Sequence, residues 1–303
     1  MSKHRSRGML PAATVSTNAP SGRKAPFRHW RLPALLMATT ALPLVLAMPA
    51  QAEVCDGGTT IVVDGAGGGT QASPWNTTSN LTLGLNSECE LTIQNGGEVN
   101  TPFNTGNVTL GVTMNSRGTL TVTGENSALT LTGSGGQSGQ PGITVGYAGI
   151  GTMTISDGGH VKSFRGTLGY SRGSVGTVTV TDNGSRWETS GVTVGGFDGG
   201  EGHLTISAGG VVTASGQSYV GYHGGVGRQN GSQGTVLVTG AGSRWENAGN
   251  LNIGSGSQQG GAIGDMTIAD GGVVTSNSGA VGVSHADARG TVTVTGAGSR
   301  WEV

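Results

Sequence analysis

The sequence predicts an all-β fold, a right-handed parallel β-helix (solenoid) of about eight three-stranded rungs, preceded by a signal peptide. The main observation is the phrase Gly-Thr-Val-x-Val-Thr-x-x-Gly-Ser-Arg-Trp-Glu, which occurs at residues 176–188, 234–246 and 290–302. The copies start 58 and 56 residues apart. Near-constant spacing of this kind is typical of arrays in which each unit stacks on the next.

The composition supports the same fold class. Glycine accounts for 60 of the 303 residues, aromatic residues for 4% and charged residues for 11%. So few bulky side chains argue against a globular core of long helices, and so few charges argue against a solvated disordered chain. A stack of short strands with glycine at its corners fits both observations.

Residues 1–52 have the features of an extended signal peptide. They contain seven cationic residues and no acidic residue, then an apolar run at 32–48, and end in Ala50-Gln51-Ala52. This order predicts export, with cleavage between Ala52 and Glu53. A transmembrane anchor is the alternative, but prolines interrupt the run and its length of roughly 17 residues is short for a bilayer span.

After the signal peptide, 17 acidic residues face nine cationic ones, a formal charge of −8. A body with a single lysine, Lys162, lacks the basic surface that nucleic-acid backbones require, so we do not expect nucleic acid as a partner.

Residues 53–117 are predicted to form an N-terminal cap and the first rungs. Cys55 and Cys89 lie one rung apart there, and thiols in an exported protein usually pair. The sequence therefore predicts a structural disulfide that fastens the end of the stack and contributes about 3 to 4 kcal/mol. The alternative is two reduced cysteines in the core.

Residues 118–303 form the repeat region. A second phrase, centred on Thr-Ile-x-x-Gly-Gly, lies between copies of the first at 151–161, 202–212 and 264–274, so the true unit is about half the longer spacing. Each unit predicts an alternating strand, a tight turn, a second strand, and a third strand that ends in an apolar residue followed by glycine. Variable loops are expected after that glycine, along one edge.

The tryptophans at 187, 245 and 301 align with valines of the intervening rungs. Alternation places Trp187, Trp245 and Trp301 inward, as a structural tryptophan ladder, with the adjacent arginine and glutamate outward in solvent. The alternative, an exposed aromatic strip for carbohydrate, requires a reversed register that would also expose the valines.

No residue pattern indicates chemistry, so we expect no catalytic, cofactor-binding or metal-binding residue and no cofactor. Ser171 lies in a Gly-x-Ser-x-Gly match, but a repeat strand rather than a helix follows it. Asp198 and Glu201 share a glycine-rich loop that suits a solvated turn better than a calcium site. The histidines have no recurring carboxylate or cysteine partner in the sequence.

The long leader, the thin cap and the Gly-Thr-Val-Thr-Val-Thr-Gly-Ala-Gly-Ser-Arg-Trp repeats resemble the passenger domains of Gram-negative autotransporters (type V secretion), in particular the group related to diffuse-adherence adhesins. This resemblance implies a module that is exported through the periplasm to the outer-membrane surface or the extracellular space. It also implies a translocation barrel of the same polypeptide as partner. The expected role is an adhesin, associated with virulence, or a structural surface module, with a host-cell or glycan ligand or self-association. We do not expect an enzyme.

Two alternatives remain. A secreted β-helical polysaccharide lyase or hydrolase would need acidic residues on adjacent rungs of one outward strand, and a two-partner-secreted haemagglutinin-like protein would carry an Asn-Pro-Asn-Gly motif. Because the sequence stops at Val303 within a rung, without the amphipathic strands of a barrel, we expect a passenger truncated in mid-rung.

Overall fold

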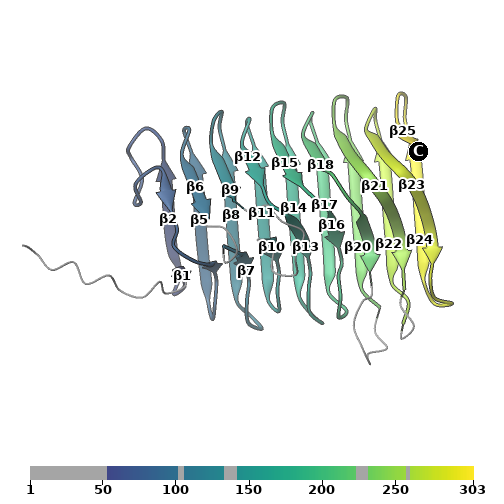
Figure 1. The fold of residues 1–303 in the computed structure, drawn as a ribbon, viewed down its shortest axis with the longest axis horizontal. Helices are drawn as coiled ribbons and strands as arrows, with labels where there is room; N and C mark the ends of the chain where they lie inside the picture. The colour runs from purple at the N-terminus through teal and green to yellow at the C-terminus, as the bar shows by residue number, and fades with distance from the viewer. Residues whose placement is uncertain (1–52, 102–105, 133–141, 223–230, 257–259) are drawn as a thin grey trace, which may run out of the picture. The chain divides into compact units, whose positions relative to one another are not determined.

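The computed structural model describes residues 53–101, 106–132, 142–222, 231–256 and 260–303, which form a stack of parallel strands (Figure 1). The predicted signal peptide and Ala52 lie outside the described residues, and Glu53 begins the first strand, β1 (Glu53–Cys55). No helix that could serve as a membrane span occurs in these ranges. The strands form one 16-stranded and one 9-stranded sheet, and every strand pair in them is parallel.

Three ladders of equivalent strands build these sheets. The first ladder is the 9-stranded sheet, made of β2 (Thr59–Asp64), β5 (Glu88–Gln94), β8 (Arg117–Thr123), β11 (Ile150–Ser156), β14 (Val175–Thr181), β17 (Glu201–Ser207), β20 (Gln233–Thr239), β22 (Ile263–Ala269) and β24 (Arg289–Thr295). The second ladder contains β3 (Trp75–Asn76), β6 (Glu98–Thr101), β9 (Ala128–Leu131), β12 (His160–Lys162), β15 (Arg186–Thr189), β18 (Val211–Ala214), the first halves of β21 (Arg244–Ser255) and β23 (Val273–Val283), and β25 (Arg300–Glu302). The third ladder contains β1, β4 (Leu81–Leu83), β7 (Val108–Leu110), β10 (Gly142–Val145), β13 (Arg165–Leu168), β16 (Val192–Val194), β19 (Ser218–Tyr222) and the second halves of β21 and β23.

We number the coils 1 to 9 by their first-ladder strand, so that β2 begins coil 1 and β24 begins coil 9. Coils 1 to 8 contribute to all three ladders, and coil 9 contributes β24 and β25. The predicted all-β parallel β-helix of about eight rungs is therefore confirmed. One detail differs: β21 and β23 run through the bend between the second and third ladders, which joins these ladders into one sheet.

The core follows from alternation along each strand. In β11, Met153 and Ile155 are fully buried, whereas the threonines between them lie at the half-exposed surface. The next coil repeats the pattern in register, because Met153 pairs with Val178 and Ile155 with Val180. Burial of one face in every coil produces a continuous column of apolar side chains, and this hydrophobic burial is the main stabilising term of the stack.

Glycine is required where the third ladder turns into the first. Gly111 follows the buried Leu110 with a φ of 62°, a left-handed conformation that glycine adopts most easily. Gly118 is the second residue of the next first-ladder strand, β8, and a side chain there would overlap the carbonyl oxygen of Leu83. The glycine that opens each unit from coil 3 onward is therefore a steric requirement of the corner.

The variable segments do not share one edge. Insertions follow β19 and β21, as expected, but the connection between β9 and β10, at the bend between the second and third ladders, is as long as that after β19. The connection between β2 and β3, between the first and second ladders, has the same length. The expectation of a single loop-bearing edge is wrong, because long connections occur at all three bends of the stack.

Two turn types alternate between the first and second ladders. Even-numbered coils use a two-residue turn with positive φ, such as Asp157 and Gly158, and coils 3, 5, 7 and 9 use a longer turn that ends in a serine, which is buried in coils 3, 5 and 7. That serine accepts a hydrogen bond from a glycine N–H of the preceding coil. The four pairs are Gly96 with Ser127 (3.0 Å), Gly158 with Ser185 (3.0 Å), Gly209 with Ser243 (3.0 Å) and Gly271 with Ser299 (2.9 Å). The serine of the Gly-Ser-Arg-Trp phrase thus fastens one coil to the next and makes two coils the repeating unit.

Replacing Ser243 with alanine should lower the free energy of unfolding by about 1 to 3 kcal/mol, because the N–H of Gly209 is then buried without an acceptor. Thermal unfolding followed by circular dichroism measures the effect. Ala241→Ser, an exposed change in the same turn, is the control and should change stability little. Equal unfolding of Ser243→Ala and wild type would contradict the coil-fastening role.

Candidate functional surfaces

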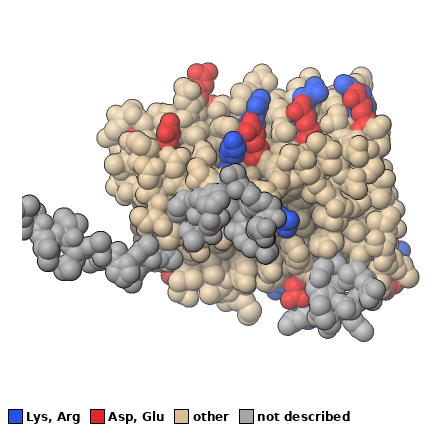
Figure 2. All heavy atoms as spheres, viewed as in Figure 1, with Lys and Arg blue, Asp and Glu red and all other residues tan. Residues whose placement is uncertain are grey.

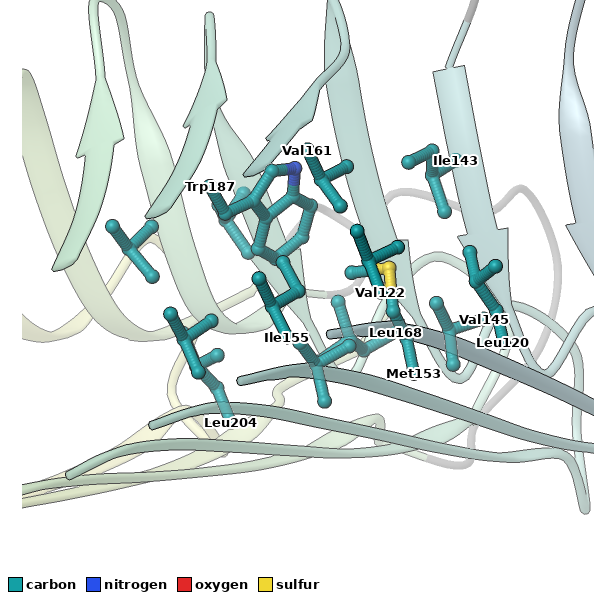
Figure 3. Packing of buried hydrophobic residues seen from close by; sticks show 14 of the residues in the cluster. Leu120, Val122, Ile143, Val145, Met153, Ile155, Val161, Leu168, Trp187 and Leu204 are labelled. Atoms are coloured by element: carbon teal, nitrogen blue, oxygen red, sulfur yellow. The ribbon is translucent and has the colours of Figure 1, made fainter. Parts of the chain in front are cut away.

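The three tryptophans of the repeat phrase point into the stack. Trp187 and Trp245 are fully buried, and Trp301, in coil 9, is partly buried. Each pairs with a valine of the preceding coil: Val161, Val212 and Val274. Figure 3 shows Trp187 packed among Val161, Ile155 and Leu168. The rings therefore fill the core and are not a surface for ligands.

Small residues of the third ladder make room for these rings. A side chain at Gly166 would overlap the six-membered ring of Trp187, and one at Gly279 would overlap that of Trp301. Ser218 stands at the equivalent position in coil 6, before the coil of Trp245. Coils 3, 5 and 7 carry larger residues there, namely Ile143, Val192 and Leu251. Large and small positions thus alternate between two ladders that are far apart in sequence.

The indole nitrogens show where the repeat is imperfect. Trp187 Nε1 donates to Ser163 Oγ and Trp301 Nε1 donates to Ser276 Oγ, both at 3.0 Å. The same position before Trp245 is Ala214, and Trp245 Nε1 is buried without a hydrogen-bond acceptor among the described residues. Because Ala214 has a methyl group where serine would offer a hydroxyl, the indole N–H of Trp245 has no hydrogen-bond partner in the core.

We expect Ala214→Ser to raise the free energy of unfolding by about 0.5 to 1.5 kcal/mol, since it supplies the missing acceptor for Trp245. Ser163→Ala should lower it by about 1 to 3 kcal/mol through the loss of the acceptor for Trp187. Chemical denaturation measures both, and opposite signs are the decisive result. Destabilisation by Ala214→Ser would show that the site cannot accept a hydroxyl.

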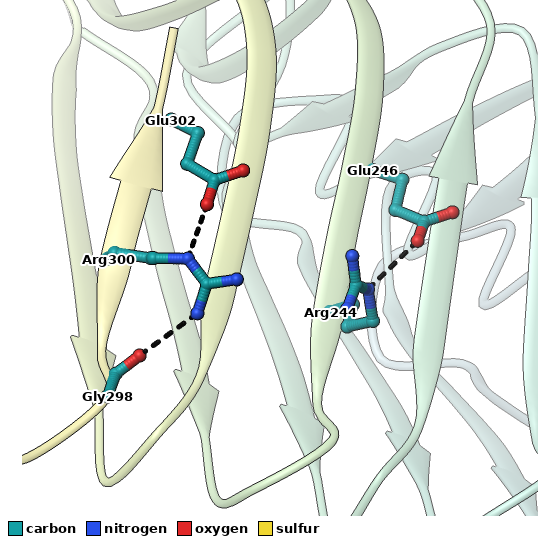
Figure 4. Close-up of polar contacts among 5 residues, drawn as sticks. All are labelled: Arg244, Glu246, Gly298, Arg300 and Glu302. Atoms are coloured by element: carbon teal, nitrogen blue, oxygen red, sulfur yellow. Dashed lines mark hydrogen bonds and ion pairs between the residues drawn. The ribbon is translucent and has the colours of Figure 1, made fainter.

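Arginine and glutamate lie on either side of each tryptophan at the surface. Arg186 contacts Glu188 at 3.2 Å and Arg244 contacts Glu246 at 2.9 Å, and Arg300 pairs with Glu302 (Figure 4). Figure 2 shows acidic and basic groups side by side along one edge, whereas most of that face is uncharged. Partly exposed pairs of this kind contribute at most about 1 kcal/mol each.

Cys55 and Cys89 form a disulfide with a Cα–Cα distance of 5.7 Å. Cys89 pairs with Gly118 of the next coil, so it occupies the position that later coils fill with glycine. The disulfide closes the N-terminal coil onto coil 2.

Asp56 holds the loop beside this disulfide. The hydroxyl and the backbone N–H of Ser87 both donate to its carboxylate at 2.7 Å, and the N–H of Asn86 donates at 3.1 Å. These hydrogen bonds, above all that from the Ser87 hydroxyl, lower the pKa of Asp56 from 3.8 to about 2. They favour the ionised carboxylate in the folded state.

A lowered pKa means that Asp56 stabilises the folded state at pH values above its ordinary pKa, and that this contribution is lost as the pH falls through about 2. Asp56→Ala should therefore unfold at a lower temperature than wild type near neutral pH. The difference should disappear in strong acid. Thermal unfolding over a pH series tests this, and a difference that does not change with pH would contradict the role of the carboxylate.

The sequence motifs that resemble catalytic or metal sites do not assemble into one. Ser171 lies in the bend after β13, and β14 follows it directly, so the strand-to-helix turn of a nucleophile elbow does not form. Glu201 lies 3.0 Å from His203. Within the described ranges, no group of three or more His, Cys, Asp or Glu side chains could hold a metal ion.

Three histidines each lie near one carboxylate, in three different arrangements that do not recur from coil to coil. His160 Nε2 lies 3.5 Å from Glu188, His203 Nε2 lies 3.0 Å from Glu201, and His285 Nδ1 lies 3.7 Å from Asp287. Glu201 and Asp287 are two residues from their histidines in the sequence, and Glu188 belongs to the coil after that of His160. Mature-region His223 lies outside the described residues.

An aromatic stack that the sequence analysis missed covers the corner after the third ladder. Tyr147 and Tyr170 stack with ring centroids 5.0 Å apart, Tyr170 and Phe197 are 5.2 Å apart, and Phe197 meets Tyr222 edge-on at 5.6 Å. These residues follow the corner glycine in coils 3 to 6. The recurrence of an aromatic residue after Gly146, Gly169 and Gly221 is the sequence pattern that could have predicted the stack. Because the rings contact one another, the stack reinforces the corner.

A groove of about 340 Å³ lies at the bend between the second and third ladders. It crosses coils 4 to 6, with Leu131 of coil 3 at one end, and its other lining residues are Lys162, Ser163, Phe164, Glu188, Thr189, Ser190, Thr213 and Ser215. This volume is within the range of small-ligand sites. Only one carboxylate, that of Glu188, belongs to the lining, whereas glycoside hydrolysis generally uses a pair.

The sequence is 39% identical over 159 residues to the adhesin BmaC autotransporter of Brucella suis biovar 1 (strain 1330). The match includes 50% of this chain and 4% of that relative, so the chain spans a small part of the length of the relative. No family model and no solved structure matches the sequence. The β-helix and this similarity together fit an autotransporter passenger domain.

Proposed function

We propose that this chain is the β-helical passenger of an exported autotransporter that acts as an adhesin or structural module at the bacterial surface. The observation that carries the proposal is the parallel β-helix in which the Gly-Ser-Arg-Trp unit recurs every two coils, together with 39% identity to an autotransporter adhesin. Equivalent surface positions recur along such a stack, which suits weak contacts made many times over.

The partners that follow are an outer-membrane translocation barrel of the same polypeptide and a host-cell or glycan ligand, with self-association as a further mode of contact. Nucleic acid is disfavoured by the formal charge of −8 after residue 52. A non-enzymatic role is supported by the relative, which is an adhesin. Cleavage after Ala52 would release Glu53 as the first residue of β1.

Surface display provides the test. The complete gene is expressed in a non-adherent bacterium, and attachment to host cells and cell-to-cell aggregation are measured. A variant without residues 118–303 should lose at least one of these activities. If neither activity changes when the deleted protein still reaches the surface, the passenger region is not the adhesive part.

A second deletion serves as the matched control. Removing residues 176–233 takes out coils 5 and 6, one complete two-coil unit, and rejoins Val175 to Gly234 with the alternation of turn types preserved. This variant should be displayed as well as wild type, because every remaining coil keeps a neighbour of the correct type. Loss of display would contradict the two-coil unit.

A further inference from the structure

We propose that the groove across coils 4 to 6 binds an acidic oligosaccharide, a segment of a uronic-acid-containing glycan that lies along the stack. The inference deepens the proposed surface function and rests on it for its biological context.

Two outward rows form the walls of the groove. Lys162, Glu188 and Thr213 are register partners in coils 4, 5 and 6 of the second ladder. Phe164, Ser190 and Ser215 stand two positions later in the same coils, just past the bend. Between the rows, the buried Ser163 and Thr189 form the floor. With about 4.8 Å between coils, the groove extends roughly 10 Å along the stack, enough for a short segment of a linear polymer.

The charges beside the groove favour an anion. Glu188 is already engaged, because Arg186 lies 3.2 Å and His160 lies 3.5 Å from its carboxylate. Lys162 and Arg165 make no ion pair with any residue in the described part of the chain, and the Arg165 guanidinium lies 5.8 Å from the centroid of the Phe164 ring. Two unpaired cations thus flank a groove on a chain of opposite overall charge.

The neutral lining favours a sugar. Phe164 is half-buried, so part of its ring is open for stacking against the C–H face of a pyranose. The hydroxyls of Thr213 and Ser215 can exchange hydrogen bonds with sugar hydroxyls, and the Ser190 hydroxyl, which donates to the carbonyl oxygen of Phe164, can accept one. An extended peptide would instead require free backbone groups for strand addition. Those at the bend are occupied: Ser163 N–H donates to Glu188 O, and Ser190 N–H donates to Phe164 O.

Isothermal titration of the purified full-length exported protein tests the proposal. The probe is a hexasaccharide of alternating glucuronic acid and N-acetylglucosamine, with a neutral N-acetylglucosamine hexamer and hexaglutamate for comparison. The acidic hexasaccharide should bind saturably and more tightly than either. Phe164→Ala and Lys162→Gln should each weaken it roughly tenfold.

Arg117→Gln is the matched control, since it removes the same charge from a pair with Glu88 outside the groove, and it should leave binding unchanged. Lys162 is exposed, so Lys162→Gln keeps the test valid if Phe164→Ala fails to fold. Absence of saturable binding, or wild-type affinity in Lys162→Gln, overturns the proposal. Equal affinity for the neutral hexamer overturns the acidic class, and tighter binding of hexaglutamate assigns the groove to acidic peptides instead. If no glycan binds while cell attachment depends on residues 118–303, only the groove assignment fails.

Discussion

Axial register is the constraint on which the rest of this structure depends. Each residue of a coil pairs with the residue at the same position in the next coil, as Gly151 does with Gly176 and Met153 with Val178. A change of one residue in register would move the buried side chains of a strand to the surface. The glycine corners, the buried apolar columns and the outward threonines all follow from keeping this register through every coil.

Register also explains why the unit contains two coils and not one. A tryptophan in every coil would place two large rings next to each other along the same column, with no small residue between them. Alternation with valine, and with glycine or serine across the core at Gly166, Ser218 and Gly279, distributes the volume evenly. The turns follow the same alternation, because a buried serine of one turn type accepts a hydrogen bond from a glycine N–H of the other.

The surface is divided between regions that repeat and regions that do not. The Arg-Glu pairs and the threonine rows recur wherever the unit recurs, so they give the stack the same character along its length. Phe164 and Lys162 have no counterpart in the other coils, because Ser190 and Ser215 follow Phe164, and Glu188 and Thr213 follow Lys162. We therefore expect selectivity for one ligand at the groove, where the repeat is broken. We expect many weak contacts at the surfaces that repeat in every unit.

The sequence by itself determined the fold class, the positions of the strands and the inward direction of Trp187 and Trp245. The reason is that repeat spacing and the alternation of apolar and polar residues are local properties, which are present in the sequence of every coil. It also brought Cys55 and Cys89 to adjacent rungs. Only the tertiary structure decided which residue each tryptophan meets across the core, and that Ala214 leaves one indole nitrogen without an acceptor. It alone assembled the aromatic stack and the groove, because residues from different coils, such as Tyr147 and Tyr170 or Lys162 and Glu188, become neighbours only when successive coils stack in register.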